Sequence, residues 1–305
     1  MSDLTVTAKS RRFYEQFPFP GNRPVDRDGL IFLRHFAGSV NRHTSLASRG
    51  RLRVLDAGCG TGNTSLSLAR QFPDIDFVGV DQSRSSLARA KQSAADSGLT
   101  NLRYRCWNLM NPLPRGSLFD IALCLGVLHH TANMKRVLLN LHGSLKDNGD
   151  LFLWIYGKHG RYRHSLNVRL LAMLLKTEPP PATSLELAKD FIRTAGNGSA
   201  LDDLLGNQPP SSMPETLFED PVWIADQFLN PHEKLLDMEQ LLAHTRSSGF
   251  AVDHIVGFDD TTVRSLLSAP LYERFRKLTR LKRLIALDLL LKPERYFLVL
   301  TRKDL

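Results

Sequence analysis

Cysteine is scarce in this chain, and its three cysteines are scattered. Cys59, Cys106 and Cys124 are distributed over 305 residues without the spacing of a metal site. Neither a disulfide framework nor a bound metal is therefore expected, and the low usage is typical of a protein kept in a reducing compartment, here the cytoplasm. We expect all three cysteines to be small residues of the core.

Long apolar runs are missing as well. The longest, such as Leu170–Leu175, are far too short to cross a bilayer, and the N-terminal MSDLTVTAKSRR has no apolar signal core. Hydrophobic residues make up 42% of the chain and charged residues 23%, as in globular proteins. The sequence predicts a chain with no transmembrane segment, large enough to bury a substantial core. Its oligomeric state is left open.

Acidic residues are outnumbered, most strongly near the C-terminus. The chain has 40 Lys+Arg against 31 Asp+Glu, which gives a net charge of +9. The densest basic stretch is Arg274–Arg283. Such a stretch can attract RNA, anionic lipid or an acidic substrate, or it can be the solvated face of an amphipathic helix.

The most informative segment is VLDAGCGTGN at Val54–Asn63. An apolar strand ends in an acid, passes three glycines and enters a helix, and the next apolar run, FVGVD, ends in Asp81. Glycines allow a ligand to approach the backbone closely, and a helix N-terminus offers free N–H groups. A carboxylate at Asp81 can accept hydrogen bonds from both hydroxyls of a ribose. The pattern predicts a nucleotide-binding α/β unit.

The spacing of the glycines separates two kinds of nucleotide site. A dinucleotide fingerprint, G-x-G-x-x-G, would place its third glycine at position 63, which holds Asn63. The run from Asp56 to Gly62 instead resembles the first motif of class I S-adenosylmethionine-dependent methyltransferases. A nicotinamide oxidoreductase is therefore the least favoured reading.

Strands and helices alternate along the middle of the chain, which predicts a parallel sheet with helices on both faces. Two closing strands follow a long interruption. This order resembles the Rossmann-like α/β fold of the same family, a seven-stranded, mostly parallel sheet whose last strand is antiparallel. The strands are expected at 53–56, 76–81, 102–107, 120–125, 150–156, 252–258 and 295–301. The helices are expected at 28–40, 65–71, 83–97, 134–145, 165–176, 184–194 and 237–247.

Four parts of the chain follow from this pattern. Residues 1–50 form an N-terminal extension or lid, and residues 51–156 form the core that binds S-adenosylmethionine. Residues 157–236 are a mainly helical insertion that caps the substrate, with a loop at Gly196–Pro214. Residues 237–305 complete the core and carry a basic helical insertion at 263–291. Aromatics alternate with prolines around Phe13–Gly21, which predicts an extended segment.

The resemblance implies the cofactor residues. The glycine loop would surround the methionine part of the cofactor, Asp81 would hold the ribose and Gln82 would lie beside the adenine. Leu125 would lie near the reacting methyl group. Asn108 stands where the family usually carries an acid that binds the adenine amino group. The implied set is Asp56, Gly58, Cys59, Gly60, Gly62, Asp81, Gln82, Asn108, Leu109 and Leu125.

The chemistry requires an acceptor in line with the activated methyl, and an O–H or N–H acceptor must lose a proton. The candidate bases are His129, His159 and Tyr14. Tyr156, Arg161 and Arg163 lie at or just after the end of the fifth strand, where ligands of open α/β sheets bind. The two arginines could hold a carboxylate or phosphate, or they could belong to a basic surface loop.

The leading hypothesis is methyl transfer from S-adenosylmethionine, which leaves S-adenosylhomocysteine, to an O, N or C nucleophile of a small or medium organic acceptor. An alternative is an RNA or protein methyltransferase that uses the Arg274–Arg283 face. A non-catalytic module that binds the cofactor, and aminopropyl transfer from a related donor, also stay open.

Overall fold

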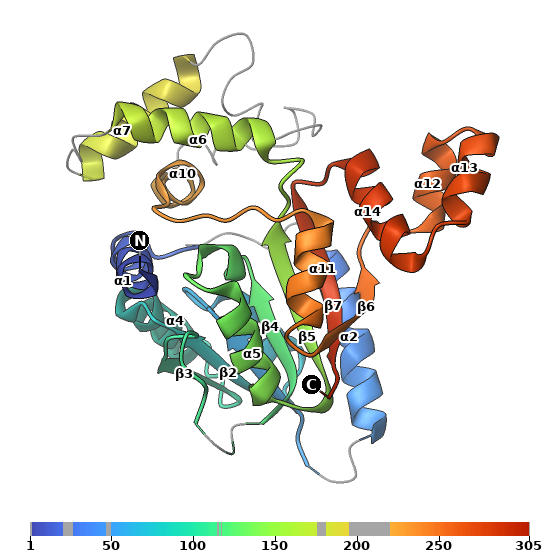
Figure 1. Cartoon of the computed structure of the whole chain (residues 1–305). Coiled ribbons are helices and arrows are strands. Elements are labelled where there is room, and N and C mark those ends of the chain that lie inside the picture. The colour runs from blue at the N-terminus through green and yellow to red at the C-terminus, as the bar shows by residue number, and fades with distance from the viewer. Residues whose placement is uncertain are drawn as a thin grey trace.

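The computed structural model describes residues 2–20, 27–46, 50–114, 116, 118–175, 181–194 and 220–304. A seven-stranded sheet in the order β3-β2-β1-β4-β5-β7-β6 forms its centre (Figure 1). Strand β7 runs antiparallel to both β5 and β6, and the other neighbouring pairs are parallel. The predicted fold class is therefore confirmed. The strands are β1 (Arg53–Ala57), β2 (Asp76–Asp81), β3 (Leu102–Cys106), β4 (Phe119–Leu125), β5 (Leu145–Tyr156), β6 (Phe250–Ile255) and β7 (Arg295–Arg302).

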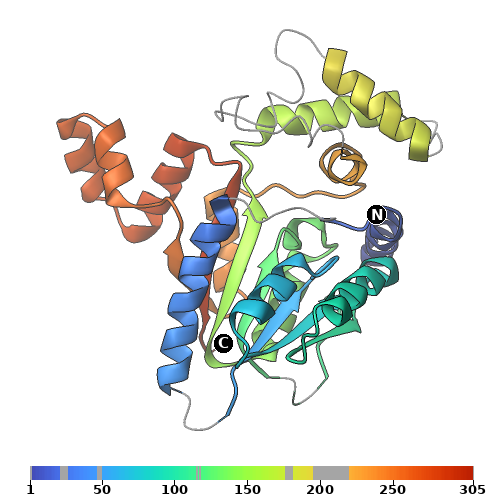
Figure 2. The same cartoon turned by 180° about the vertical axis from the view of Figure 1, so that it is seen from behind.

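Helices cover both faces of the sheet, because the central strands are apolar on both sides. One face packs against α5 and α11, and the other, seen in Figure 2, against α2, α3 and α4. Helix α1 docks on the first turn of α4, where the Glu15 carboxylate accepts backbone N–H groups of Arg84 and Ser85. These helices are α1 (Asp3–Gln16), α2 (Arg27–Leu46), α3 (Asn63–Gln71), α4 (Arg84–Asp96), α5 (Met134–Ser144) and α11 (Met238–Arg246).

Several helices begin directly after a polar N-cap residue, at the position that the sequence pattern indicates. Ser83 accepts a hydrogen bond from the Ser86 backbone at the start of α4. Asp237 and Gln240 form a capping box at the start of α11. Two of the predicted helices, 83–97 and 237–247, therefore differ from the observed ones only by their cap residues.

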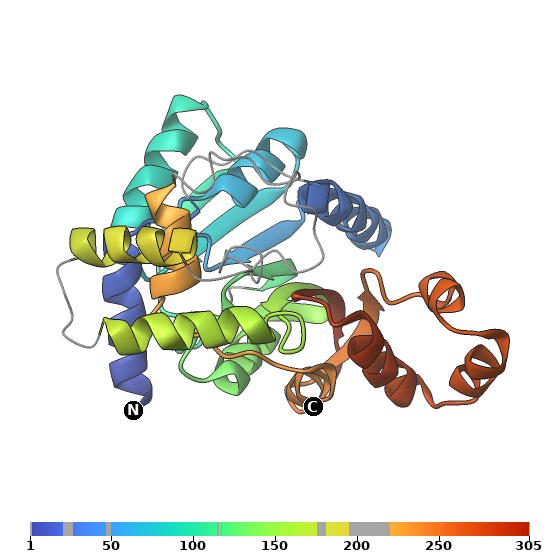
Figure 3. The same ribbon diagram turned by 90° about the horizontal axis from the view of Figure 1, so that it is seen from above.

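Two helical groups rise beyond the carboxyl ends of the parallel strands (Figures 1 and 3). The cap comprises α6 (Tyr162–Leu174), α7 (Pro181–Thr194), α10 (Pro221–Ile224) and the π-helix η3 (Ala225–Leu229). It has an apolar cluster of its own, around Trp223 and Phe228. The arm comprises α12 (Asp260–Leu266), α13 (Ala269–Arg276) and α14 (Arg280–Leu291). No helix in the described ranges is long and apolar enough to cross a membrane.

Several sequence-based expectations about elements are wrong. Residues 13–16 of the segment predicted to be extended belong to α1, because the prolines begin only at Pro18 and the preceding residues continue an uninterrupted helix. Strand β5 begins at Leu145, directly after α5, five residues before the expected start at 150. The strand expected at 252–258 is β6, which begins at Phe250 and ends at Ile255. The insertion expected to be helical at 263–291 divides into three helices. The expected loop Gly196–Pro214 lies outside the described residues.

Candidate functional site

A cleft lies at the carboxyl ends of β1, β2 and β4, with α1 along its other side. It holds about 1060 Å³ of space free of protein atoms, part of it open to solvent. This edge of the sheet is where open α/β folds bind their ligands. Nine of the ten residues predicted to contact the cofactor line it: Asp56, Gly58, Cys59, Gly60, Asp81, Gln82, Asn108, Leu109 and Leu125.

The glycine loop between β1 and α3 forms the floor of the cleft. Gly60 has a φ of +54°, and a Cβ there would collide with the carbonyl oxygen of Phe19. The Thr61 N–H donates to the same carbonyl at 3.1 Å, so the N-terminal segment is held directly against the loop. Gly62 faces Tyr104 and Ala90 instead of the cleft. The loop thus needs Gly60 for close approach of the chain that covers the site, and Gly62 for packing of α3 and β3.

The carboxylates of buried Asp56 and half-buried Asp81 lie at the loop. Asp81 accepts the Gly60 N–H at 2.9 Å and the Ser83 N–H at 2.8 Å, and each oxygen keeps a second lone pair. Burial raises the pKa of Asp81, and these backbone donors oppose the rise. Burial also raises the pKa of Asp56, to about 6, and its Oδ2 has no hydrogen-bond partner within the described residues. The loop therefore presents negative charge to a ligand at neutral pH.

The end of β3 contributes an amide in place of the family's usual acid. The Oδ1 atom of Asn108 accepts the Met110 N–H at 2.9 Å, so this oxygen closes the turn after β3. Trp107 lines the cleft beside it, which the sequence analysis did not foresee. The role of Asn108 toward an adenine stays a prediction.

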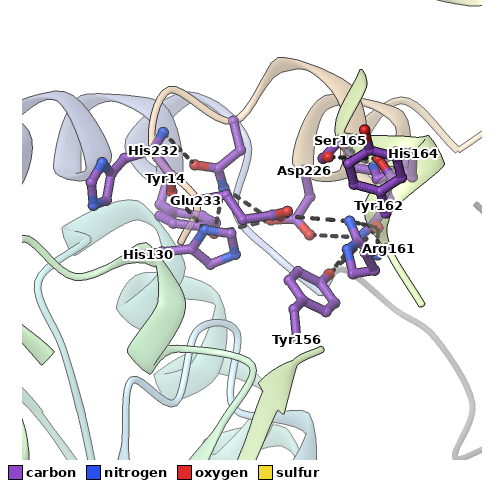
Figure 4. Close-up of polar contacts among 12 residues, drawn as sticks. Tyr14, His130, Tyr156, Arg161, Tyr162, His164, Ser165, Asp226, His232 and Glu233 are labelled. Carbon is purple, nitrogen blue, oxygen red and sulfur yellow. Dashed lines mark hydrogen bonds and ion pairs between the residues drawn. The ribbon is translucent and has the colours of Figure 1, made fainter. Parts of the chain in front are cut away.

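Tyr14 forms part of the opposite wall of the cleft, and Figure 4 shows it at one end of a polar network. Its hydroxyl donates to Oδ1 of Asp226 at 3.0 Å and accepts from Nδ2 of Asn230 at 2.9 Å. Burial, followed by the neighbouring Asp226 carboxylate, raises the pKa of Tyr14 well above its ordinary value. Tyr14 is therefore protonated at neutral pH and aims its proton at Asp226.

The network continues from Asp226 into the cap. Gln227 donates to Oδ2 of Asp226 and to the Tyr156 hydroxyl, both at 2.9 Å. The Arg161 guanidinium lies over the Tyr156 ring at 3.6 Å, donates to Gln227 and pairs with Glu233 at 3.5 Å. All of these groups except Glu233 are buried. Arg161 and Tyr156 thus hold the cap on the end of β5 and stand behind the wall of the cleft.

The histidines occupy three different places. His130 lines the cleft, whereas His129 is fully buried behind it, with its ring 4.1 Å from that of Tyr156. Burial lowers the pKa of His129 well below its ordinary value, with smaller contributions from His130 and Arg161. His159 does not line the cleft, and its Nε2 lies 3.5 Å from Asp288 on α14. Arg163 lies exposed on α6. Of the three predicted bases, the structure places only Tyr14 in the cleft.

Sequence reasoning missed Asp226, Gln227 and Asn230. Asp226 and Gln227 come from η3, and Asn230 follows its last residue. Only their position beside Tyr14 reveals them, because no motif marks the segment. Ser10 was missed as well, and it lines the cleft while donating to the carbonyl of His130.

The sheet order, the glycine loop and the acid at the end of β2 define a Rossmann-like nucleotide-binding protein. Comparisons with known proteins narrow this class. Residues 55–151 match a family model described as a methyltransferase domain. The chain is 39% identical over 105 residues to a ubiquinone biosynthesis O-methyltransferase of Bradyrhizobium diazoefficiens, covering 34% of this chain and 40% of that protein. Residues 55–151 are therefore a methyltransferase domain, and the chain resembles the class I S-adenosylmethionine-dependent methyltransferases in this region.

The chain also resembles a further protein in sequence and another in fold. An uncharacterized protein of a Synechococcus strain is 31% identical over 161 residues, which cover 52% of this chain and 39% of that protein. The chain thus spans less than half the length of these curated relatives. The solved structure of PKMT2 from Rickettsia typhi superposes with a TM-score of 0.65 at 15% identity, covering 88% of this chain and 52% of that one, which shows a shared fold. A second structure of PKMT2, in complex with AdoHcy, superposes with a TM-score of 0.64.

The residues of the cleft fit S-adenosylmethionine. Asp81 retains lone pairs for the ribose hydroxyls, and Asp56 presents a buried, unpartnered oxygen beside the loop. The cofactor carries positive charge on its sulfonium and amino groups, which two carboxylates favour. In this family the cofactor supplies a methyl group that its sulfonium has already activated for transfer.

Proposed function

We propose that the protein transfers the methyl group of S-adenosylmethionine to an O, N or C nucleophile of a small or medium organic acceptor. The observation that carries this proposal is the wall opposite the glycine loop. It is built from α1 and the 3-10 helix η1 (Leu128–His130), and the cap supports it from behind. Phe19 reaches both the loop and the apolar cluster of the cap. Residues 1–50 thus act as a lid and residues 157–236 as a substrate cap, which leaves room for a compact acceptor.

The polar network supports a role in removing a proton from the acceptor. Tyr14 touches the cleft and cannot itself ionise at neutral pH, but Asp226 can receive its proton over 3.0 Å. For an O–H or N–H acceptor, the acceptor proton passes to the Tyr14 oxygen while the Tyr14 proton passes to Asp226. The acceptor atom forms its bond to the methyl carbon, and the carbon–sulfur bond breaks. Asn230 holds the Tyr14 oxygen in place throughout.

The comparisons favour oxygen among the acceptor atoms. Several relatives are O-methyltransferases of ubiquinone biosynthesis, and the matched region covers the cofactor core that this chain shares with them. The basic segment Arg274–Arg283 is not argued to hold the acceptor, because none of the described residues of the arm lines the cleft. Arg161, Tyr156 and Arg163 are proposed to support or border the acceptor pocket without binding the reacting atom.

Two variants test the proposed reaction. Tyr14→Phe and Asp226→Asn should each lower the rate of methyl transfer by about a hundredfold or more while changing the affinity for S-adenosylmethionine little. The assay follows tritiated methyl from the cofactor into a panel of phenols, catechols, hydroxy acids and amines. Tyr162→Phe, which removes an exposed hydroxyl in the cap, is the matched control.

Transfer to at least one small acceptor, with loss in both site variants and not in the control, supports the proposal. Full activity in Tyr14→Phe and Asp226→Asn would refute the proton relay. Failure to methylate any member of the panel, with tight cofactor binding, would instead refute the small-acceptor assignment.

A further inference from the structure

The arm between β6 and β7 is a separate structural unit attached to the side of the sheet (Figures 1 and 2). Val263, Phe275 and Leu287 bury one another in a small apolar cluster of its own. Its last helix is fixed to the body by buried Asp288, which accepts the Met238 N–H at 2.9 Å and the Tyr296 hydroxyl at 2.6 Å. The arm therefore presents its outer surface from a fixed base.

The charged residues of the arm are mostly basic. Between Arg264 and Arg283 there are seven Lys or Arg residues and a single acid, Glu273. Arg276 is held by Glu273 and by the Tyr272 ring, and Arg280 donates to the carbonyl of Val252. Four exposed cations have no ion pair or hydrogen bond with any other described residue: Arg264, Arg274, Lys277 and Lys282. The surface is thus available to an anionic partner.

Leucine side chains are exposed between these cations. Their exposed fractions lie between 36% and 55%, although the arm has a buried cluster that could have taken some of them. On α13, Leu271 and Arg274 lie three residues apart, Leu278 follows in the turn before α14, and Leu281 lies beside Lys282 at the start of α14. Exposed leucines flanked by cations form a surface that is both apolar and basic: Leu266, Leu271, Leu278, Leu281 and Leu289.

The aromatic residues of the arm argue against a single-stranded RNA. Such ligands are bound by stacking bases on exposed aromatic rings. Phe275 is buried, and Tyr272 packs on the apolar cluster with Arg276 over its ring. No other aromatic residue occurs between Arg264 and Leu291. Leucine side chains, in contrast, are stabilised when they enter the boundary between lipid headgroups and acyl chains.

We propose that the arm binds the surface of an anionic lipid bilayer, with its leucines in the interface and its cations on the headgroups. Each cation near such a surface contributes about fivefold to the partition coefficient. The arm and the cap lie beyond the same end of the sheet (Figure 1), which is also the end that carries the cleft. Binding would therefore hold the catalytic edge of the protein near the membrane surface, where an apolar acceptor could be collected.

Flotation of the full-length protein with vesicles tests this surface. Vesicles of phosphatidylcholine with 30% phosphatidylglycerol, a composition on the order of natural anionic content, should carry the protein, and pure phosphatidylcholine vesicles should carry several-fold less. The triple variant R274S/K277S/K282S should lose most of the binding. The variant L271S/L278S/L281S should lose at least about tenfold, because its cations remain but its apolar anchors do not.

The matched control is R89S/K91S, which removes two exposed cations from α4 and should bind like the original protein. Circular dichroism verifies that each variant is folded. Equal binding by the leucine variant, equal loss in the control, or tight binding of a labelled RNA without vesicle binding would each overturn the proposal. The outcome does not depend on methyl transfer, so it stands or falls separately from the proposed function.

Discussion

At the scale of single residues, the charge of two carboxylates controls what the cleft can bind. Asp81 is held by backbone donors at the end of β2, whereas one oxygen of Asp56 has no partner within the described part of the chain. Asp56 is buried and Asp81 is half-buried, which makes their negative charge costly without a cationic ligand. The loop is thus arranged to gain most from a ligand that carries positive charge.

The pKa of Asp56 predicts a pH dependence of cofactor binding. With a pKa raised to about 6 by burial, Asp56 is almost fully ionised at pH 7.5 and about one quarter ionised at pH 5.5. If binding requires the carboxylate, the Kd for S-adenosylmethionine should rise about fourfold over this interval. Calorimetric titration at several pH values measures it. Asp56→Asn should remove the dependence, and an unchanged slope in that variant would show that another group titrates.

At the scale of elements, the glycine loop is shaped by the segment that covers it. Gly60 has both a positive φ and no room for a side chain, because Phe19 lies against it. Gly98, at the end of α4, has a similar φ of +64° but nothing within 4 Å of an added Cβ. Substitutions at these two positions therefore distinguish the effect of backbone strain, which both share, from the effect of displacing the lid, which only Gly60 has.

Gly60→Ala and Gly98→Ala should destabilise the fold to a similar extent, by about 1–2 kcal/mol, through the same left-handed strain. Only Gly60→Ala should also weaken S-adenosylmethionine binding, by about tenfold or more, because residues 19–20 must move away from the loop. Thermal unfolding and calorimetry measure the two effects. Equal affinities in the two variants would contradict a lid that touches the loop.

One buried carboxylate of the sheet binds helix α2 in addition to the apolar packing of that helix. Asp150, in the middle of β5, accepts from Ser39 and Arg42 and lies 3.0 Å from Nε2 of His43. Burial alone would raise the pKa of Asp150, but these partners outweigh it and lower the pKa. The Asp150 carboxylate therefore stabilises the fold at every pH above the pKa that it has in the unfolded chain. This contribution is lost as the pH falls through the lower pKa that it has in the folded protein.

Asp150→Ala should cost about 3 kcal/mol of unfolding free energy, because it leaves the buried Ser39 and His43 and the Arg42 guanidinium without their shared acceptor. The Tm should fall by roughly 6–12 °C. Asp147→Ala, three residues away and 85% exposed, should change the Tm by little. Comparable losses in the two variants would mean that Asp150 contributes no more than a surface charge.

How far the sequence predicts this molecule differs between its elements. The strand–turn–helix units from β1 to β4 could be predicted because apolar periodicity, caps and glycines there are local signals. Helix α1 was missed because the prolines after it dominated the reading of the segment. The wall of the cleft could not be predicted, since Tyr14, Asp226 and Tyr156 meet only through contacts separated by 71 residues or more.

At the scale of the whole molecule, three chain segments enclose one edge of the sheet. The α1 lid, the cap and the turn after β4 meet around the cleft, and the arm rises beside them. The lid, the cap and the arm are additions that lie outside residues 55–151, the region that matches the methyltransferase domain model, whereas the turn after β4 lies within it. Differences between this protein and its relatives in acceptor and location are therefore expected in these additions.

Calorimetric titration of the full chain tests the central claim most directly. S-adenosylmethionine and S-adenosylhomocysteine should bind, and NAD should not. Asp81→Ala should weaken both by about tenfold to a hundredfold, whereas Asp76→Ala, at the other end of β2, should leave both affinities unchanged. Binding of NAD alone, or equal affinities in the two variants, would contradict the assignment of this cleft to S-adenosylmethionine.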